Sequence, residues 1–335
     1  MVEPASSPIP GTGSSSRRIW LRVLRFGALA LIVVGLAVFV RRLDFGTLAS
    51  VLRRADWTLM AAAVGVGLVG MVSRASFWWL ALSPLGPFSL PDAVRLSFGA
   101  LAGNLLVPGG FAGDAFRVWR LRDRFGIRPV ASLVALGVEK ATDSTLLFTL
   151  AALLPFLWPG LPPQIRRILE ILPLVAGIVA IAVLFGVRRF RGALARWLGE
   201  LALLRSPGRV ILGILALVGA RAMELGQISL VLAGLGLPSG PALALLVVVC
   251  VNVAISLPVS PGNAGTHEAG SLAALSLAGL AAPQALAFAA LCHVVQAGPL
   301  VLGGLPDLRS VWTAGRTSGR PDANQLLSPV DQARP

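Results

Sequence analysis

Charged side chains are scarce in this sequence, because Asp, Glu, Lys and Arg together make up only 13% of its 335 residues. Soluble globular domains carry roughly 25% charged residues, and a chain with half of that cannot cover a water-facing surface. Hydrophobic residues make up 56% of the chain, and its mean hydropathy is +0.80. Its apolar runs approach the roughly 20 residues that a bilayer-spanning helix needs. The composition excludes a soluble domain and predicts an all-α polytopic membrane protein.

Cysteine and histidine are also rare, with two residues of each type. Cys250 and Cys292 lie in apolar stretches, without the spacing of a disulfide or metal framework. His267 and Glu268 are adjacent, but no second histidine follows at HExxH spacing, so we expect no catalytic metal. P-loop, GxSxG and GxGxxG fingerprints are absent as well. We therefore expect no cofactor and no direct ATP hydrolysis, and no residue pattern assigns an enzymatic activity.

Lysine is nearly absent: 28 of the 29 basic residues are Arg, and the net charge is +14. The Arg residues lie in short clusters between apolar runs, which indicates positive-inside topology and contact with anionic membrane lipid, and argues against nucleic-acid binding. Four clusters share one side if 92–125 enters as a re-entrant hairpin from the cytoplasm and 241–280 enters from the opposite face. A fifth cluster around Arg41 and Arg53 opposes this topology, which places the N-terminus inside.

The chain divides into a membrane domain at 19–306 between tails at 1–18 and 307–335, which we expect to be disordered because they are polar and rich in Pro, Ser or Gly. Two Pro/Gly clusters, 104–114 and 257–268, are expected to be non-helical. Irregular backbone at membrane depth persists only when it is buried in protein or lines a wet cavity. The predicted membrane segments are 19–40, 57–82, 92–107, 129–157, 167–187, 208–234, 241–257, 266–280 and 283–305.

Rare polar residues recur at similar offsets along the chain. Arg74 and Arg221 lie 147 positions apart, and Asn104 precedes its Pro/Gly cluster as Asn252 does, 148 positions later. The pattern predicts repeats at 57–157 and 208–305, joined by 167–187 and an interfacial amphipathic helix at 187–204. The predicted sidedness gives the repeats opposite orientation. Interrupted segments at corresponding places of two inverted halves are the best sequence pointer to a transport site.

Ionisable groups inside membrane spans cost roughly 2.5–3.5 kcal/mol on insertion scales, so we expect them to face the bundle interior. Glu139 and Asp143 share a helix face, and the single Lys140 cannot neutralise both. Arg221 and Glu224 are spaced for an intrahelical pair. Broken helix ends and Arg side chains both suit phosphate. The predicted substrate cavity comprises Arg74, Asn104, Pro108, Asp114, Arg117, Glu139, Asp143, Arg221, Asn252, Pro258, Pro261, Gly262, Gly265 and Glu268.

Three motifs carry a family resemblance: N-x-x-x-P with G-D-x-x-R at 104–117, E-K-x-x-D at 139–143, and P-x-x-P-G-x-x-G-x-x-E at 258–268. Together they resemble the flippase-like family of the lysylphosphatidylglycerol synthase transmembrane region, over roughly residues 20–305. The resemblance implies a multi-pass protein of the bacterial or archaeal cytoplasmic membrane that translocates a polar lipid or lipid-linked head group. Asn263 stands where the family often has Gly, and Asn tolerates the left-handed backbone. We expect no aminoacyl-transferring domain after residue 305, and so no lysyl-lipid synthesis by this chain.

Three functions stay open at this point. The chain is a carrier of a lipid head group, a membrane-embedded transferase acting on a polyprenyl-phosphate, or a non-transporting partner of an envelope-lipid synthase. The expected partners are a phospholipid or polyprenyl-linked lipid and anionic membrane lipid, with a lipid synthase or a second copy of the chain left open.

Overall fold

The computed structural model describes residues 45–106, 111–158, 160–167, 169–171, 206–256 and 261–317. Within these ranges every regular element is a helix and none is a strand, which confirms the predicted fold class. The elements are α2 (Phe45–Arg54), α3 (Trp57–Leu82), η1 (Ser83–Leu85), α4 (Leu90–Leu106), α5 (Phe111–Phe125), α6 (Pro129–Leu157), α9 (Pro207–Gly234), α10 (Pro241–Ile255), η3 (Pro261–Asn263), α11 (Thr266–Leu277) and α12 (Ala282–Thr317).

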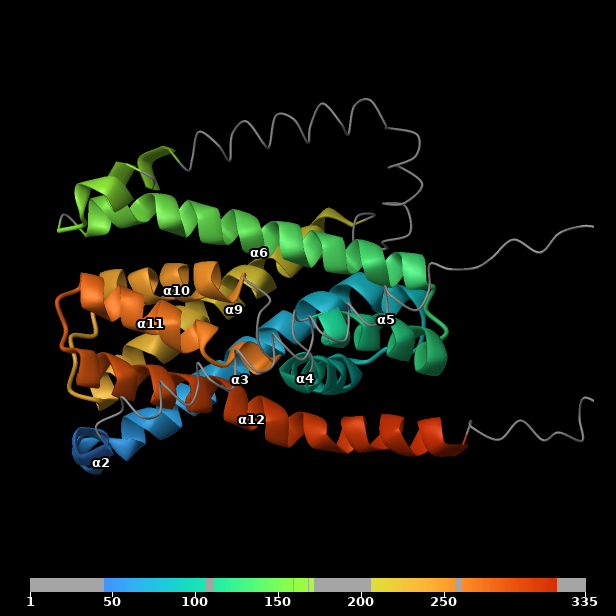
Figure 1. Ribbon diagram of the computed structural model, residues 1–335. Coiled ribbons are helices and arrows are strands. Elements are labelled where there is room, and N and C mark those ends of the chain that lie inside the picture. Colours follow the sequence, from blue (N-terminus) through green and yellow to red (C-terminus); the bar gives the residue numbers. More distant parts are fainter. Residues whose placement is uncertain are drawn as a thin grey trace, which may run out of the picture.

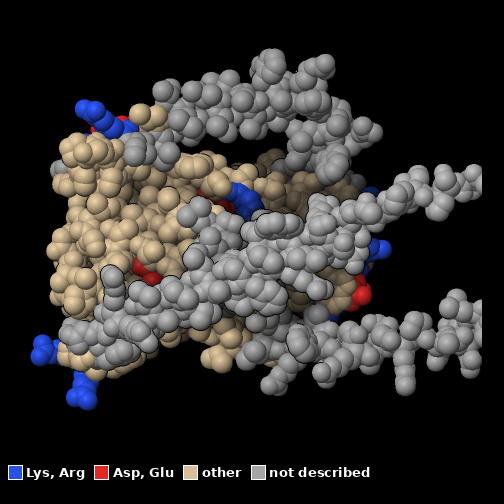
Figure 2. All heavy atoms as spheres, viewed as in Figure 1, with Lys and Arg blue, Asp and Glu red and all other residues tan. Residues whose placement is uncertain are grey.

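Four of these helices, α3, α6, α9 and α12, contain a stretch that is long and apolar enough to cross a membrane. Only 17–33% of the residues in each stretch are buried, and Phe156 and Leu302 are 79% and 72% exposed. Contiguous apolar surface of this extent indicates contact with lipid. On the face in Figure 2, the visible charges of the described residues lie mainly toward the two ends, with a small group near the middle.

The described helices form two units with the same element order, α3–α4–α5–α6 and α9–α10–α11–α12. Helices of one unit pack against helices of the other: α4 packs against α12, and α10 packs against α6. In Figure 1 the α10–α11 pair lies at the left and the α4–α5 pair toward the right, with α3 and α9 crossing between them. Each short helix pair is therefore covered by the last helix of the other unit.

The helices α3 and α9 form the central contact between the units and run antiparallel. Asp56 N donates to Gly234 O at 2.8 Å, and Ser73 Oγ donates to Ala216 O at 2.7 Å, so the partner number falls as the chain advances. Small residues bring the two backbones together, as is common between membrane helices. A Cβ added at Gly70 would lie only 2.9 Å from Met223 Cβ. The helices α3 and α9 are the first helices of two units with the same element order, so these units run in opposite directions at this contact and are named the inverted units.

The two helices of each short pair also approach each other closely at a glycine. A Cβ added at Gly113 of α5 would lie 2.0 Å from Ala100 O of α4, and one added at Gly270 of α11 would lie 2.6 Å from Val251 Cα of α10. The two pairs also touch, because η3, which lies between α10 and α11 in the chain, packs against α4.

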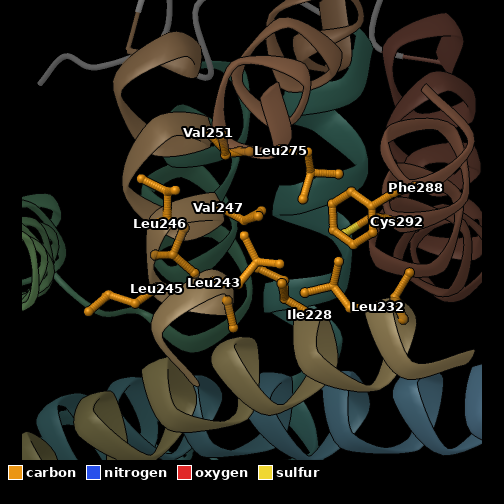
Figure 3. Packing of buried hydrophobic residues seen from close by; sticks show 14 of the residues in the cluster. Ile228, Leu232, Leu243, Leu245, Leu246, Val247, Val251, Leu275, Phe288 and Cys292 are labelled. Carbon is orange, nitrogen blue, oxygen red and sulfur yellow. The ribbon is translucent and has the colours of Figure 1, made fainter. Parts of the chain in front are cut away.

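The apolar core is largest in the second unit. Figure 3 shows Ile228 and Leu232 of α9 facing Val247 of α10, with Leu275 of α11 and Phe288 of α12 packed beside them. These side chains are nearly or fully excluded from solvent. This part of the interior is therefore apolar, and the charged residues described below lie outside it.

Several predicted boundaries need correction. The clusters 104–114 and 257–268 are not wholly irregular, because α4 continues to Leu106, α5 begins at Phe111 and α11 begins at Thr266. Proline and glycine disfavour only the backbone around them, and the helix resumes directly afterwards. As expected for Asn263, its φ is 57°, in the left-handed region. The helix α12 continues to Thr317, so the tail predicted from 307 is wrong over its first residues, where a helix extends past the apolar stretch.

One further helix was not predicted, and some predictions cannot be compared. The sequence analysis left 41–56 unassigned, whereas 45–54 forms α2. The predicted span 19–40, the amphipathic helix 187–204, most of 167–187 and the first tail lie outside the described residues.

Candidate functional site

A cavity of about 370 Å³ lies where the two inverted units meet. Every helix of both units except α11 contributes to its lining, and its volume is in the range of small-ligand pockets. Eight of the predicted site residues line it: Arg74, Asn104, Asp114, Arg117, Glu139, Asp143, Arg221 and Asn252. The inverted arrangement thus brings together polar residues that are far apart in the sequence.

Glu139 is the central anion of the cavity wall, with 2% of its side chain exposed. Its Oε1 accepts from Arg74 Nη1 at 3.0 Å, and its Oε2 accepts from Arg117 Nη1 and from Trp78 Nε1, both at 3.1 Å. The Arg117 guanidinium also lies over the Trp78 ring, 4.9 Å from its centroid. A carboxylate this deeply buried is stable only with such complete compensation.

Asp143, one helical turn further along α6, joins the first helices of the two units. It is hydrogen-bonded to Arg74 of α3, and its Oδ1 lies 3.8 Å from Arg221 Nη2 of α9. Arg221 Nη1 donates to Glu224 Oε2 at 2.5 Å, which confirms the predicted intrahelical pair. The equivalent arginines therefore converge on one carboxylate across the α3–α9 contact.

The charges of the cavity lining balance. Asp114 lies 3.4 Å from Lys140 Nζ, so the lysine pairs with it and the arginines compensate Glu139 and Asp143. Buried Nε atoms of Arg117 and Arg221 find no hydrogen-bond partner among the described residues. Four cations and four carboxylates line the cavity: Arg74, Arg117, Lys140 and Arg221 with Asp114, Glu139, Asp143 and Glu224.

The two predicted asparagines act differently. Asn104 Oδ1 accepts from Gly113 N at 2.6 Å and so bridges α4 and α5. Asn252 Nδ2 instead donates to Val248 O of its own helix at 2.8 Å. The start of α11 is closed by Glu268, whose Oε2 accepts from Gly265 N at 2.6 Å.

Six predicted residues are not among the described residues that line the cavity. Among the described residues, Gly262, Gly265 and Glu268 do not line it, because Glu268 turns to its own backbone and to His293. Pro108 and Pro258 lie outside the described residues, as does the side chain of Pro261.

Polar residues that the sequence analysis left out of the site also line the cavity. They are Lys140, Glu224, Gln227 and Gln296, and Trp78 supports the wall from behind. The signal for Gln227 and Gln296 was available, since each is an uncharged polar residue inside an apolar run. Trp78 gave no such signal, because tryptophans are common in membrane helices.

The structure places the three sequence motifs on helices of the two units, and a comparison with known families identifies the family of the chain. The family model of the lysylphosphatidylglycerol synthase TM region matches residues 25–304. The chain belongs to this family. As a lysylphosphatidylglycerol synthase TM region, it is a membrane domain of the flippase-like type. No curated protein and no solved structure matches it.

Proposed function

We propose that this membrane domain moves the polar head group of a lipid through the cavity between its inverted units, in the cytoplasmic membrane of a bacterium or archaeon. The carrying observation is the charge-balanced lining, with four cations and four carboxylates in one cavity. The cargo is a phospholipid or polyprenyl-linked lipid, and its acyl or prenyl chains stay in the bilayer.

The arrangement supports a head group that bears charges of both signs. Arginine forks bind phosphate oxygens in a planar geometry, and carboxylates bind amines. Because each cavity ion already has a protein partner, such a head group exchanges one set of ion pairs for another. A purely anionic head would leave Glu139 and Asp143 without their arginines, which is costly for buried charges.

Inverted units give a physical route for this movement. Repeats of opposite orientation that share a central site support alternating access, in which one unit rocks against the other. The antiparallel α3–α9 contact is the natural boundary for such motion, since Arg74 and Arg221 meet Asp143 there. These pairs are distributed between the units, so a change in their relative position changes the cavity.

The test is transbilayer movement of fluorescent lipids in proteoliposomes, measured by access of a membrane-impermeant quencher. We expect wild-type protein to move lipids whose heads carry both a phosphate and an amine faster than phosphatidylglycerol. Asp143→Asn should slow the movement by about tenfold or more, since each 1.36 kcal/mol lost is tenfold in rate. Glu170→Gln is the matched control, because Glu170 is an exposed carboxylate paired only with Arg166 among the described residues.

Wild-type protein that redistributes no head-group class would contradict the carrier. A covalent lipid product without redistribution would favour the transferase instead. Folding of each variant is checked by size-exclusion chromatography before reconstitution.

A further inference from the structure

A second polar cluster lies outside the charge-balanced cavity, at the start of α11 and on the facing side of α12. The histidine cluster consists of His267, Glu268 and His293. One nitrogen of each histidine and one carboxylate oxygen of Glu268 lie within 4.8 Å of one another. Both histidines of the chain therefore meet one carboxylate, although they are 26 positions apart in the sequence.

His267 offers a free lone pair in this cluster. Its Nε2 lies 3.2 Å from Gln296 Oε1, and an amide oxygen only accepts, so Nε2 carries the hydrogen and Nδ1 carries the lone pair. Nδ1 is buried and has no hydrogen-bond partner among the described residues, in a side chain that is 6% exposed. A buried acceptor without a partner is costly unless a ligand satisfies it.

His293 and Glu268 complete the donor set. His293 Nδ1 lies 2.6 Å from Glu268 Oε1. The rings of His267 and His293 lie 4.6 Å apart between centroids, so two imidazolium ions there would repel. At least one ring is then neutral, which is the form that binds metal ions.

Two of the three donors are also held from their other side. Gln296 hydrogen-bonds to His267, and the backbone N–H of Gly265 hydrogen-bonds to Glu268. Outer hydrogen bonds of this kind orient the ligands of metal sites and fix the histidine tautomer.

We propose that the histidine cluster binds one divalent transition-metal ion, with Zn²⁺ as the best match. Two imidazoles and one carboxylate are a common zinc donor set, which leaves a fourth position open. Tetrahedral ligands about 2.0–2.2 Å from zinc lie about 3.4 Å from one another, within reach of small side-chain rotations from the present spacing. The absence of HExxH spacing does not exclude this site, because the second histidine comes from another helix.

The site adjoins the cavity through one residue. Gln296 hydrogen-bonds to His267 and also lines the cavity. Metal binding would fix the start of α11 against α12 and hold Gln296 in place. The proposal concerns binding alone and does not depend on lipid movement.

The experiment uses full-length protein in detergent, purified through a tag free of histidine and cysteine and stripped with a chelator. After dialysis against Zn²⁺, elemental analysis should find about one ion per chain, and Co²⁺ should give the visible absorption of a tetrahedral site. Zn²⁺ should also raise the unfolding temperature of the wild type, because it binds the folded state. His293→Ala and Glu268→Gln should abolish the retained ion, whereas Glu170→Gln should keep it.

Substitution of Gln296, which orients His267 without being a proposed ligand, should have an intermediate effect on Zn²⁺ binding. Gln296→Ala leaves all three donors in place and should weaken Zn²⁺ binding by about 10–100-fold. Wild-type protein that retains no Zn²⁺ and gains no thermal stability from it overturns the proposal, even if no variant folds. Retention that is equal in wild type and His293→Ala marks adventitious binding and overturns it as well.

Discussion

The two halves of the bundle share a backbone plan and differ in their chemistry. Glu139 lies about three turns into α6, and His293 lies about three turns into α12, the last helices of the two units. Glu139 lines the cavity and accepts from Arg74, Arg117 and Trp78. His293 pairs with Glu268 outside it. The inverted fold therefore constrains the helices and their contacts, while each half is free to place different ions at matching positions.

The largest expected effect on stability comes from substitution of Glu139, the more deeply buried of the two residues. Glu139→Gln should lower the free energy of unfolding by about 3–5 kcal/mol, since it removes the nearest carboxylate of the buried Arg117 and one of the two carboxylates that pair with Arg74. His293→Gln, in metal-free protein, removes one hydrogen bond to a charged group and should cost only about 1.5–3 kcal/mol. Equilibrium unfolding in mixed micelles measures both.

Equal losses for Glu139→Gln and His293→Gln would show that the two positions are alike in stability, and the contrast between the halves would be lost. Glu170→Gln sets the baseline, because its carboxylate is exposed.

The bounds of the long membrane-spanning helices could be predicted well from the sequence. The bounds of α3 and α6 agree with the predicted segments 57–82 and 129–157, because long apolar runs limited by polar or Pro-containing joins leave little choice. The sequence did not predict that α5 begins at Phe111. The first turn of α5 contains Gly113, which fits closely against Ala100 O, and no local pattern reveals such a contact between helices.

The candidate site was predictable in its members and not in its pairing. Rare ions in apolar spans identified Arg74, Glu139 and Arg221. The partners could not be assigned, because Arg74 meets Glu139 only when α3 packs beside α6. The predicted cavity position of Glu268 was wrong for a similar reason: the helix start turns its carboxylate to Gly265 N and His293.

An intermediate effect is expected where the halves agree. Gly113→Ala and Gly270→Ala should each destabilise the protein by about 1–3 kcal/mol, because the new methyl group would meet backbone atoms of the paired helix. Gly137→Ala is the matched control, since nothing lies within 4 Å of its added Cβ. Thermal unfolding of the three variants measures the difference, and a loss confined to one half would show that only that helix pair needs close contact.

The smallest effect is expected at the start of the two central helices. Asp56 accepts from Thr58 N at 2.8 Å and from Leu59 N at 3.3 Å, whereas Ser206 at the start of α9 makes no side-chain cap hydrogen bond. Hydrogen bonds from the Thr58 hydroxyl and these amides lower the pKa of the Asp56 carboxyl. Asp56→Ala should reduce the unfolding temperature slightly at neutral pH, and Ser206→Ala should not.

The pH dependence of this cap follows from the direction of the shift. A carboxyl whose pKa is lower in the folded state stabilises the protein above its unfolded pKa, and this contribution is lost as the pH falls through the folded value. The difference between wild type and Asp56→Ala should therefore disappear in acid. A difference that persists there would mean that the cap acts through packing and not through its charge.

The balance of charges in the cavity has an electrical consequence. Moving one elementary charge across a membrane voltage of 100 mV changes its free energy by about 2.3 kcal/mol. The charges of the four cations and four carboxylates that line the cavity sum to zero. Movement of the empty cavity lining across the membrane would therefore respond little to the voltage. A head group of zero net charge would then cross without current, and a cationic one would be driven by the voltage in a direction set by its own charge.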